Sequence, residues 1–314
     1  MATEKLTANQ KSVLQEHEPI LQACTDPLEA HKSITAIQRV FLEQRSHHRL
    51  LKPKLHYYEI LLNSGRTDEA AQGFEAIHKR TKEGTRIHLE CTALLGICRL
   101  RQKRLPEAKN NIRLVIENTQ NIRSDSRRSQ FYQRLVKRVE EECILSQLIG
   151  QQQGALVLNE IHAKSIELVK KSESELLEQI AAALPVGTPA LVQDVTGYSI
   201  GLLPPADQKR LPAPPPQIPQ TEWGKKALAA LKRLGWKSFC DKNSGIYKFW
   251  SKGSSKIFGE GYFTSAIITT FNDWKIGLPQ LAAGIAATAM RFGCLEFCAQ
   301  FRPEGLMIPK SDKN

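Results

Sequence analysis

The stretch "YYEILLNSGRTDEAAQGFEAI", residues 57–77, sets the expectation for the N-terminal half of the chain. Gly65 lies between two segments of helical character, and Ala70, Phe74 and Ile77 follow it at helical spacing. Glycine commonly follows the last residue of a helix, and the small side chain of alanine lets two helices approach closely. We therefore expect the turn and the second helix of an antiparallel helix pair here.

The segment "LLGICRLRQKRLPEAKNNIRLVI", residues 94–116, repeats this arrangement. Leu95 and Gly96 precede Ala108, and Ile112 and Val115 follow it at helical spacing. Two copies of one helix–turn–helix pattern indicate a repeat architecture, in which neighbouring pairs bury each other's apolar faces. The alternative is a plain helical bundle whose alanines only permit close packing.

Residues 54–118 resemble the tetratricopeptide repeat (TPR) family. The matching residues are Gly65, Ala70 and Phe74 in one repeat and Leu95, Gly96 and Ala108 in the other. The early aromatic residue of the family is missing from both, and the alanines are 38 residues apart, against about 34 in the family. The resemblance implies a helical array over residues 1–183 with a concave face for a peptide or protein partner.

Helix-boundary residues support a helical N-terminal half. Asp26-Pro27 is typical of a helix start, because Asp accepts hydrogen bonds as N-cap and Pro suits the first position. Pro53 and Pro106 are each expected to open another helix. Gly65 and Gly84 lie where helices should end.

Residues 184–220 are expected to be irregular and proline-rich. The β-branched segment around Val195-Thr196-Gly197 predicts a small hairpin. Seven prolines between Pro204 and Pro219 predict an extended, polyproline-like linker. Such a segment is also typical of a ligand for SH3-type domains, although a spacer needs no such role.

Residues 221–314 are expected to form a separate basic, aromatic-rich α+β module, because they hold all four tryptophans and no histidine. A helix ending at Gly235 is predicted to lead into strands at 236–240 and 246–250, joined by a turn. A third strand is predicted within "KIFGEGYFTS", residues 256–265. The fold class is therefore mainly α, with this small α+β module at its C-terminal end.

This module is the expected site of nucleic-acid binding. Between Thr221 and Tyr262 there are nine Lys or Arg residues and three acids, and bases stack on aromatic rings while lysines follow the phosphate backbone. The candidate nucleic-acid-binding residues are Lys237, Tyr247, Lys248, Phe249, Trp250, Lys252 and Lys256. The alternative is that the aromatic residues build a small core and the lysines keep it soluble.

A second basic region covers residues 99–138, with twelve Lys or Arg residues against three acids. Arg127, Arg134 and Arg138 share one face of a helix and are the candidate partner-binding residues, suited to an acidic peptide or a phosphate backbone. The alternative is a solvated helix face. The acids Glu140, Glu141 and Glu142 are expected on the surface of the same helix, without partners.

The apolar segment from Ile276 to Phe301 predicts a buried helix. A membrane-spanning helix needs about twenty predominantly apolar residues, and Arg291 and Glu296 interrupt this segment. Its small residues also suit self-association or insertion into a membrane.

The whole-chain composition favours an intracellular protein with acidic partners. The 314 residues carry a formal net charge of +12, which favours nucleic acid, anionic membranes or acidic protein faces. The N-terminus has no secretory pattern, and seven scattered cysteines among apolar neighbours predict reduced, buried thiols. We therefore expect a cytoplasmic protein.

No catalytic constellation, phosphate-binding loop or metal-ligand spacing is recognisable, so no enzyme activity, cofactor or metal is expected. The function that the sequence favours is an adaptor: the helical array binds a partner protein and the C-terminal module contacts nucleic acid. The alternative is an effector-like protein whose C-terminal apolar helices self-associate or perturb a membrane while the array senses a partner.

Overall fold

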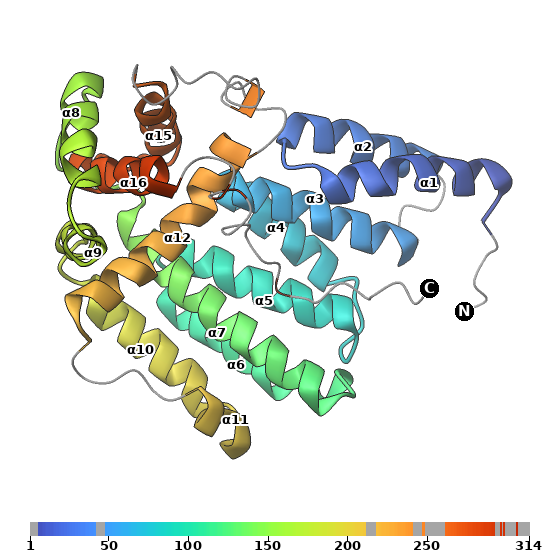
Figure 1. Ribbon diagram of the computed structural model, residues 1–314. Coiled ribbons are helices and arrows are strands. Elements are labelled where there is room, and N and C mark those ends of the chain that lie inside the picture. The colour runs from blue at the N-terminus through green and yellow to red at the C-terminus, as the bar shows by residue number, and fades with distance from the viewer. Residues whose placement is uncertain are drawn as a thin grey trace. The chain divides into compact units, whose positions relative to one another are not determined.

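The computed structural model describes residues 6–41, 48–211, 218–240, 247–248, 261–292, 296, 298 and 306. These residues are mainly helical, as Figure 1 shows, and within them the β pairing is one isolated bridge between Gln152 and Gly277. The chain divides into two compact units. Unit 1 comprises residues 1–99 and 110–122, and unit 2 comprises residues 100–109 and 123–314. The mainly α fold class is confirmed.

Unit 1 is built from helix pairs that follow one another along the chain. Its helices are α1 (Ala8–Ala23), α2 (Pro27–Val40), α3 (Leu51–Asn63), α4 (Thr67–His78), most of α5 (Arg86–Arg101) and the later part of α6 (Leu105–Glu117), with short 3-10 turns at His48–Leu50 and Thr119–Asn121. Helix α1 packs on α2, α2 on α3, and α3 on α4. Because the connections are short, successive helices run antiparallel.

The helix boundaries of unit 1 follow from the capping residues. Asp26 accepts hydrogen bonds from the backbone N–H groups of Leu28 and Glu29 at the start of α2, with Pro27 in the first position. Gly65 and Gly84, which follow α3 and precede α5, adopt φ angles of 88° and 80°. That conformation strains any residue with a Cβ. Gly65 lies at the end of α3, as predicted, whereas Gly84 lies in the connection that precedes α5 and not at a helix end.

The core of unit 1 is apolar along the facing sides of its helices. One cluster joins α1, α2 and the start of α3 through Leu14, Leu21, Ile34, Ile37, Phe41 and Leu50. Phe74 of α4 is fully buried, and the ring of Tyr58 lies edge-on with its centroid 6.1 Å away. The thiol of Cys91 on α5 donates to the carbonyl oxygen of Phe74 at 2.9 Å, so α5 contacts α4.

In unit 2, helices that are far apart in the sequence pack on one another. Its helices are α7 (Asp125–Leu148), α8 (Leu158–Val169), α9 (Glu173–Ala182), α10 (Thr188–Gly201), α11 (Pro205–Arg210), α12 (Gln220–Cys240), α15 (Tyr262–Asp273) and α16 (Pro279–Phe292). Helix α12 packs on α9 and α7, α10 packs on α7, and α16 packs on α8, α9 and α15. Figure 1 shows α8, α9, α15 and α16 grouped together.

The packing of α12 on α9 depends on a glycine. A Cβ added at Gly224 would lie 2.1 Å from the carbonyl oxygen of Leu177, so only glycine allows this approach of the two backbones. Helix α12 was expected in a separate module of residues 221–314, apart from a helical array of residues 1–183. The compact units of the structure are divided at other residues than these.

Several local predictions in the C-terminal half were wrong. The hairpin expected around Val195-Thr196-Gly197 is instead the middle of α10. Its residues Val192, Val195, Thr196 and Ile200 are buried at helical spacing where α10 packs on α7, so tertiary contact overrides their β-strand preference. Part of the expected extended linker, Pro205–Arg210, is helix α11, and residues 212–217 lie outside the described residues.

The expected α+β module shows no strand in its described residues. Helix α12 does not end at Gly235 but continues to Cys240, because Leu231, Leu234 and Phe239 keep a helical apolar stripe buried. Tyr247 and Lys248, expected in the second strand, are helical, and Tyr262–Ser265, expected in the third, open α15. Residues 241–246 and 249–260 lie outside the described part of the chain.

The apolar C-terminal segment contains a buried helix, as expected, over Pro279–Phe292. Residues 281–289 of α16 are all buried. A search of the described helices finds none with both the length and the apolar character needed to cross a membrane.

Candidate functional site

A row of ionisable residues crosses the first, third and fifth helices of unit 1. We call it the charged face: Glu18 of α1, Lys52, His56 and Glu59 of α3, and Arg86 and Glu90 of α5. The spacing of four and three residues puts the three α3 residues on one side of that helix, and Arg86 and Glu90 are likewise one turn apart.

The α1 side of the charged face is a shallow depression lined by Glu18, Lys52 and His56. Burial lowers the pKa of His56, and the positive charge of Lys52 lowers it further, against the opposing carboxylates of Glu59 and Glu18. The imidazole is therefore neutral at pH 7. It can offer one donor and one acceptor to a partner.

The α5 side of the charged face holds two neighbouring carboxyl groups, Glu59 and Glu90. Burial, and then the charge of Glu59, raise the pKa of Glu90 to about 7, although Arg86 and Lys52 oppose this shift. Both acids are half-buried, and within the described residues no salt bridge reaches either carboxylate. This pair therefore lacks the close positive partner that two adjacent carboxylates require.

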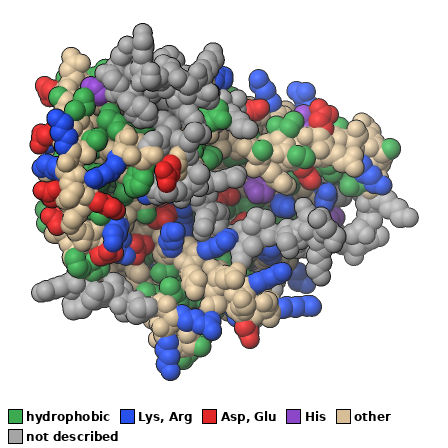
Figure 2. Space-filling view, in the orientation of Figure 1, with side chains coloured by type: hydrophobic (Ala, Val, Ile, Leu, Met, Phe, Trp, Pro, Cys, Tyr) green, Lys and Arg blue, Asp and Glu red, His purple; other side chains and the backbone are tan. Residues whose placement is uncertain are grey.

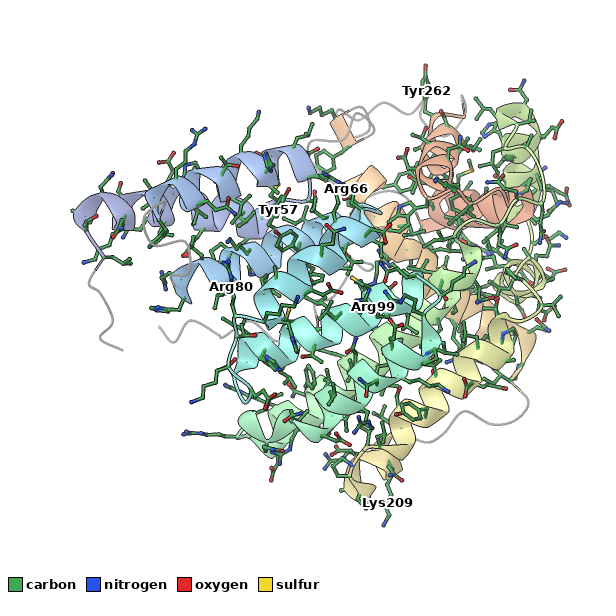
Figure 3. The ribbon with its side chains drawn as sticks, turned by 180° about the vertical axis from the view of Figure 1, so that it is seen from behind. Tyr57, Arg66, Arg80, Arg99, Lys209 and Tyr262 are labelled. Carbon is green, nitrogen blue, oxygen red and sulfur yellow. A yellow bond between two sulfur atoms is a disulfide. The ribbon has the colours of Figure 1, made fainter. Side chains whose placement is uncertain are left out.

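Several charged or polar groups elsewhere in unit 1 are paired with their own neighbours. The guanidinium of Arg66 binds the carboxylate of Glu69, and the hydroxyl of Tyr57 lies 3.2 Å from Nδ1 of His31. Figure 3 labels Tyr57, Arg66 and Arg99, and Arg99 pairs with Glu75. By contrast, no ion pair reaches Glu59 or Glu90 within the described residues.

The predicted partner-binding arginines differ in exposure. Arg127 is exposed and Arg134 is half-buried on α7, whereas Arg138 is only 5 % exposed. A guanidinium nitrogen of Arg138 lies 2.7 Å from a carboxylate oxygen of Glu142. Arg138 is therefore a buried ion-pair residue and not part of a surface dock.

The three consecutive acids of α7 were expected on the surface without partners, and this was wrong. Glu142 is fully buried and Glu141 is 7 % exposed. The basic partners within unit 2 are Lys226 for Glu140, Arg233 for Glu141, and Arg101 with Arg138 for Glu142. Buried carboxylates need such partners, so the acids fix α12 and the end of α5 to α7.

Most of the predicted nucleic-acid-binding residues lie outside the described part of the chain. These are Phe249, Trp250, Lys252 and Lys256, and the side chain of Lys237. Of the two that are described, Lys248 is exposed and Tyr247 is half-buried, both in a helical segment. These two residues were expected in a strand, and they are helical instead.

The expectation of reduced thiols throughout was wrong for two cysteines. Cys240 and Cys298 form a disulfide with their Cα atoms 5.4 Å apart, and the indole N–H of Trp236 donates to the carbonyl oxygen of Cys298. Cys91, Cys98 and Cys143 are free and buried, and Cys24 is free and half-buried. Across the described ranges, no group of three or more His, Cys, Asp or Glu side chains could hold a metal ion.

Positive charge is not gathered in one patch on the α8 and α9 side of unit 2. Figure 2 shows Lys and Arg side chains interspersed there with Asp and Glu side chains. One such pair is Lys164 with Glu167 on α8, 2.8 Å apart. This surface is therefore a weaker candidate for binding a phosphate backbone than the basic sequence between Thr221 and Tyr262.

The chain matches no known family model, no curated protein and no solved structure. The resemblance to TPR proteins therefore stays a prediction.

Proposed function

We propose that this protein is a non-enzymatic interaction protein, and that unit 1 is a TPR-like helical array that binds a partner segment on its charged face. The Glu59–Glu90 carboxyl pair carries this proposal, because burial and the charge of Glu59 raise the pKa of Glu90 to about 7 although Arg86 and Lys52 oppose the shift. Raised pKa values next to a like charge are typical of functional positions. A basic side chain from a partner would relieve the repulsion and restore the charged form of Glu90.

The rest of the charged face defines the preferred partner. Lys52 and Arg86 are exposed cations that flank the carboxyl pair, and His56 is a neutral donor and acceptor. A segment that alternates the sign of its charges, with a Lys or Arg opposite Glu59 and Glu90, is complementary to this face. Complementary charges favour association rate and specificity more than affinity itself.

A random-peptide display selection on the full-length protein tests this proposal. We expect the selected peptides to share a Lys or Arg, and the double variant Glu59→Gln with Glu90→Gln to weaken their binding at least tenfold. Glu69→Gln, which removes an acid paired with Arg66 outside the charged face, is the matched control and should bind normally. Selected peptides that bind the double variant as tightly as the wild type contradict the proposal.

The second part of the proposed function is contact with nucleic acid by the basic sequence from Thr221 to Tyr262. Its support is the excess of nine Lys or Arg residues over three acids, and the exposure of Lys248. Binding of the full-length protein to single-stranded RNA or DNA should fall steeply as salt rises. Replacing Lys248, Lys252 and Lys256 by Ala should reduce that salt dependence, whereas unchanged binding removes this part of the proposal.

The effector-like alternative stays open for the C-terminal helices. Nine consecutive residues of α16 are buried, so this helix would have to leave its packing on α8, α9 and α15 before it could enter a membrane. Leakage of dye from vesicles on addition of the folded protein would favour the alternative over the adaptor.

A further inference from the structure

A pocket of about 210 Å³ opens in unit 1 where three helices meet at their ends. His78 is the last residue of α4, His88 lies in the first turn of α5, and Asn118 directly follows α6. Glu83, in the connection between α4 and α5, and Thr92 of α5 complete its polar lining. No residue of this pocket belongs to the charged face, so the two sites are independent.

The hydrogen bonds around His88 fix which of its nitrogens carries a proton. The hydroxyl of Thr81 lies 3.0 Å from the carbonyl oxygen of His78, which can only accept, so the single hydroxyl hydrogen points there. Nδ1 of His88 lies 3.0 Å from the same hydroxyl oxygen, and with the hydroxyl hydrogen on the His78 carbonyl we assign Nδ1 as the donor. In the neutral ring, Nε2 is then an acceptor, and among the described residues it has no hydrogen-bond partner.

Two other polar side chains of the pocket each donate a hydrogen bond to a backbone carbonyl. The Thr92 hydroxyl donates to the carbonyl oxygen of His88 at 2.8 Å, and the amide nitrogen of Asn118 donates to the carbonyl oxygen of Leu114 at 2.8 Å. Their oxygens remain as acceptors. Glu83 is exposed and adds a carboxylate, and the described residues that line the pocket include no Lys or Arg.

The second histidine of the pocket, His78, is disfavoured in its positively charged form. The ring centroids of His78 and His88 are 4.1 Å apart, with 33° between the ring planes. Burial lowers the pKa of His78, the neighbouring His88 lowers it further, and Glu83 opposes the shift. A protonated His78 would have to face His88 at this distance, so the neutral ring is favoured.

We propose that this pocket binds an organic cation that carries an ammonium or guanidinium group on a short aliphatic stem. The lining presents acceptors and one carboxylate, and such a cation supplies the missing N–H donors and the opposite charge. Leu89 and Leu114 line the same pocket and suit the aliphatic stem. Its volume of about 210 Å³ is below the roughly 300–1,000 Å³ of pockets for drug-sized ligands, which restricts the ligand to a small one.

Isothermal titration of the full-length protein with n-butylammonium chloride at pH 7.5 tests this proposal. We expect saturable binding that n-butanol and sodium butyrate, of similar size but neutral or negative, do not reproduce. Glu83→Gln and His88→Ala should each weaken it about tenfold or more. Glu16→Gln, which replaces an exposed acid of α1 outside the pocket, should leave it unchanged.

Two further measurements distinguish the source of the cation and the state of the rings. Nα-acetyl-lysine N-methylamide presents the same ammonium from a peptide; tighter binding than butylammonium assigns the pocket to a basic side chain, and weaker binding assigns it to a free amine. Imidazole nitrogen NMR shifts should show His88 protonated at Nδ1 and not at Nε2. Acidification that protonates His78 should abolish binding, because a positive charge then enters the pocket.

Three results would overturn the proposal. These are equal heats with butanol and butylammonium, unchanged affinity in Glu83→Gln, or a proton on Nε2 of His88 in the free protein at pH 7.5. Because Glu83 is exposed, its substitution should not impair folding, and circular dichroism of the variant checks this. Since the charged face is not involved, failure here would leave the proposed adaptor function intact.

Discussion

Arg101 and Glu142 form a two-bond ion pair in the interior of unit 2. Nε of Arg101 lies 2.6 Å from one carboxylate oxygen and Nη2 lies 2.9 Å from the other, and the two side chains are 1 % and 0 % exposed. The guanidinium carbon of Arg101 also lies 4.9 Å from the ring centroid of Trp274. This pair connects the end of α5, the middle of α7 and the segment after α15.

Removing the carboxylate from this pair should destabilise unit 2 strongly. Glu142→Ala leaves the guanidinium groups of Arg101 and Arg138 buried without their shared anion, which should lower the free energy of unfolding by about 3–5 kcal/mol. Urea unfolding followed by circular dichroism measures this. Glu117→Ala, which removes an exposed ion pair with Arg113, should cost about 1 kcal/mol or less.

An apolar replacement of the whole ion cluster should be less damaging than this single change. In the triple variant Arg101→Met, Arg138→Met and Glu142→Leu, no charge remains buried, so we expect much of the stability to return. If Glu142→Ala is as stable as the Glu117→Ala control, the buried cluster does not hold these elements together.

The local features of the fold could be predicted from the sequence, because they depend on neighbouring residues. Asp26 caps a helix through N–H groups two and three residues away, and Gly65 and Gly84 adopt the positive φ angles expected of them. The predictions of a strand at Trp236–Cys240 and of a hairpin at Val195 were wrong, because β-branched and aromatic residues also fill the interfaces between helices. Contact of α10 with α7, and of α12 with α9, decided their structure.

The sites were less predictable, since their residues meet only in the folded chain. Glu142 pairs with Arg101 at a sequence separation of 41, and Glu141 pairs with Arg233 at a separation of 92. The run of three acids in the sequence therefore does not indicate which basic residues pair with it. The charged face was missed for the same reason, although Lys52, His56 and Glu59 have a spacing that a helix brings to one side. The pocket at His78 and His88 is completed by the end of a third helix, so it forms only when the chain has folded.

Gly224→Ala should separate α12 from α9. The added methyl group would lie 2.1 Å from the carbonyl oxygen of Leu177, which is backbone and cannot move aside cheaply. We expect a loss of about 1–3 kcal/mol of unfolding free energy by urea titration. Gly197→Ala in α10 is the matched control: no atom lies within 4 Å of the added Cβ, so better helix propensity should stabilise by up to about 1 kcal/mol. Equal effects of the two substitutions would contradict the close packing at Gly224.

The Cys240–Cys298 disulfide should stabilise unit 2. It closes a loop of 58 residues, for which loss of chain entropy in the unfolded state gives at most about 4 kcal/mol. Cys298→Ser should therefore lower the unfolding midpoint in the absence of reductant, and reductant should lower that of the wild type but not of the variant. Thiol labelling of the unfolded, unreduced protein should modify five of the seven cysteines. Seven labelled thiols would show that the bond is absent.

Glu90 should make the stability of unit 1 fall as pH rises through the weakly acidic range. Its pKa is about 7 in the folded chain against an ordinary value of 4.5. Between these values the folded state holds a proton that the unfolded state has released, so stability decreases with rising pH up to about 7 and then levels off. Glu142, whose pKa is lowered, contributes in the opposite direction, and its contribution is lost only as the pH falls below the ordinary value.

Glu90→Gln tests this dependence, because the amide carries no charge at any pH. Relative to the wild type, the variant should gain about 1 kcal/mol of unfolding free energy at pH 8 and little or nothing at pH 5, a gain kept modest because the side chain is not completely buried. Glu16→Gln, at an exposed position, should leave the difference between the two pH values unchanged. Parallel pH profiles for wild type and Glu90→Gln would show that the carboxyl is already compensated in the free protein, and the case for a basic partner at the Glu59–Glu90 pair would lose its basis.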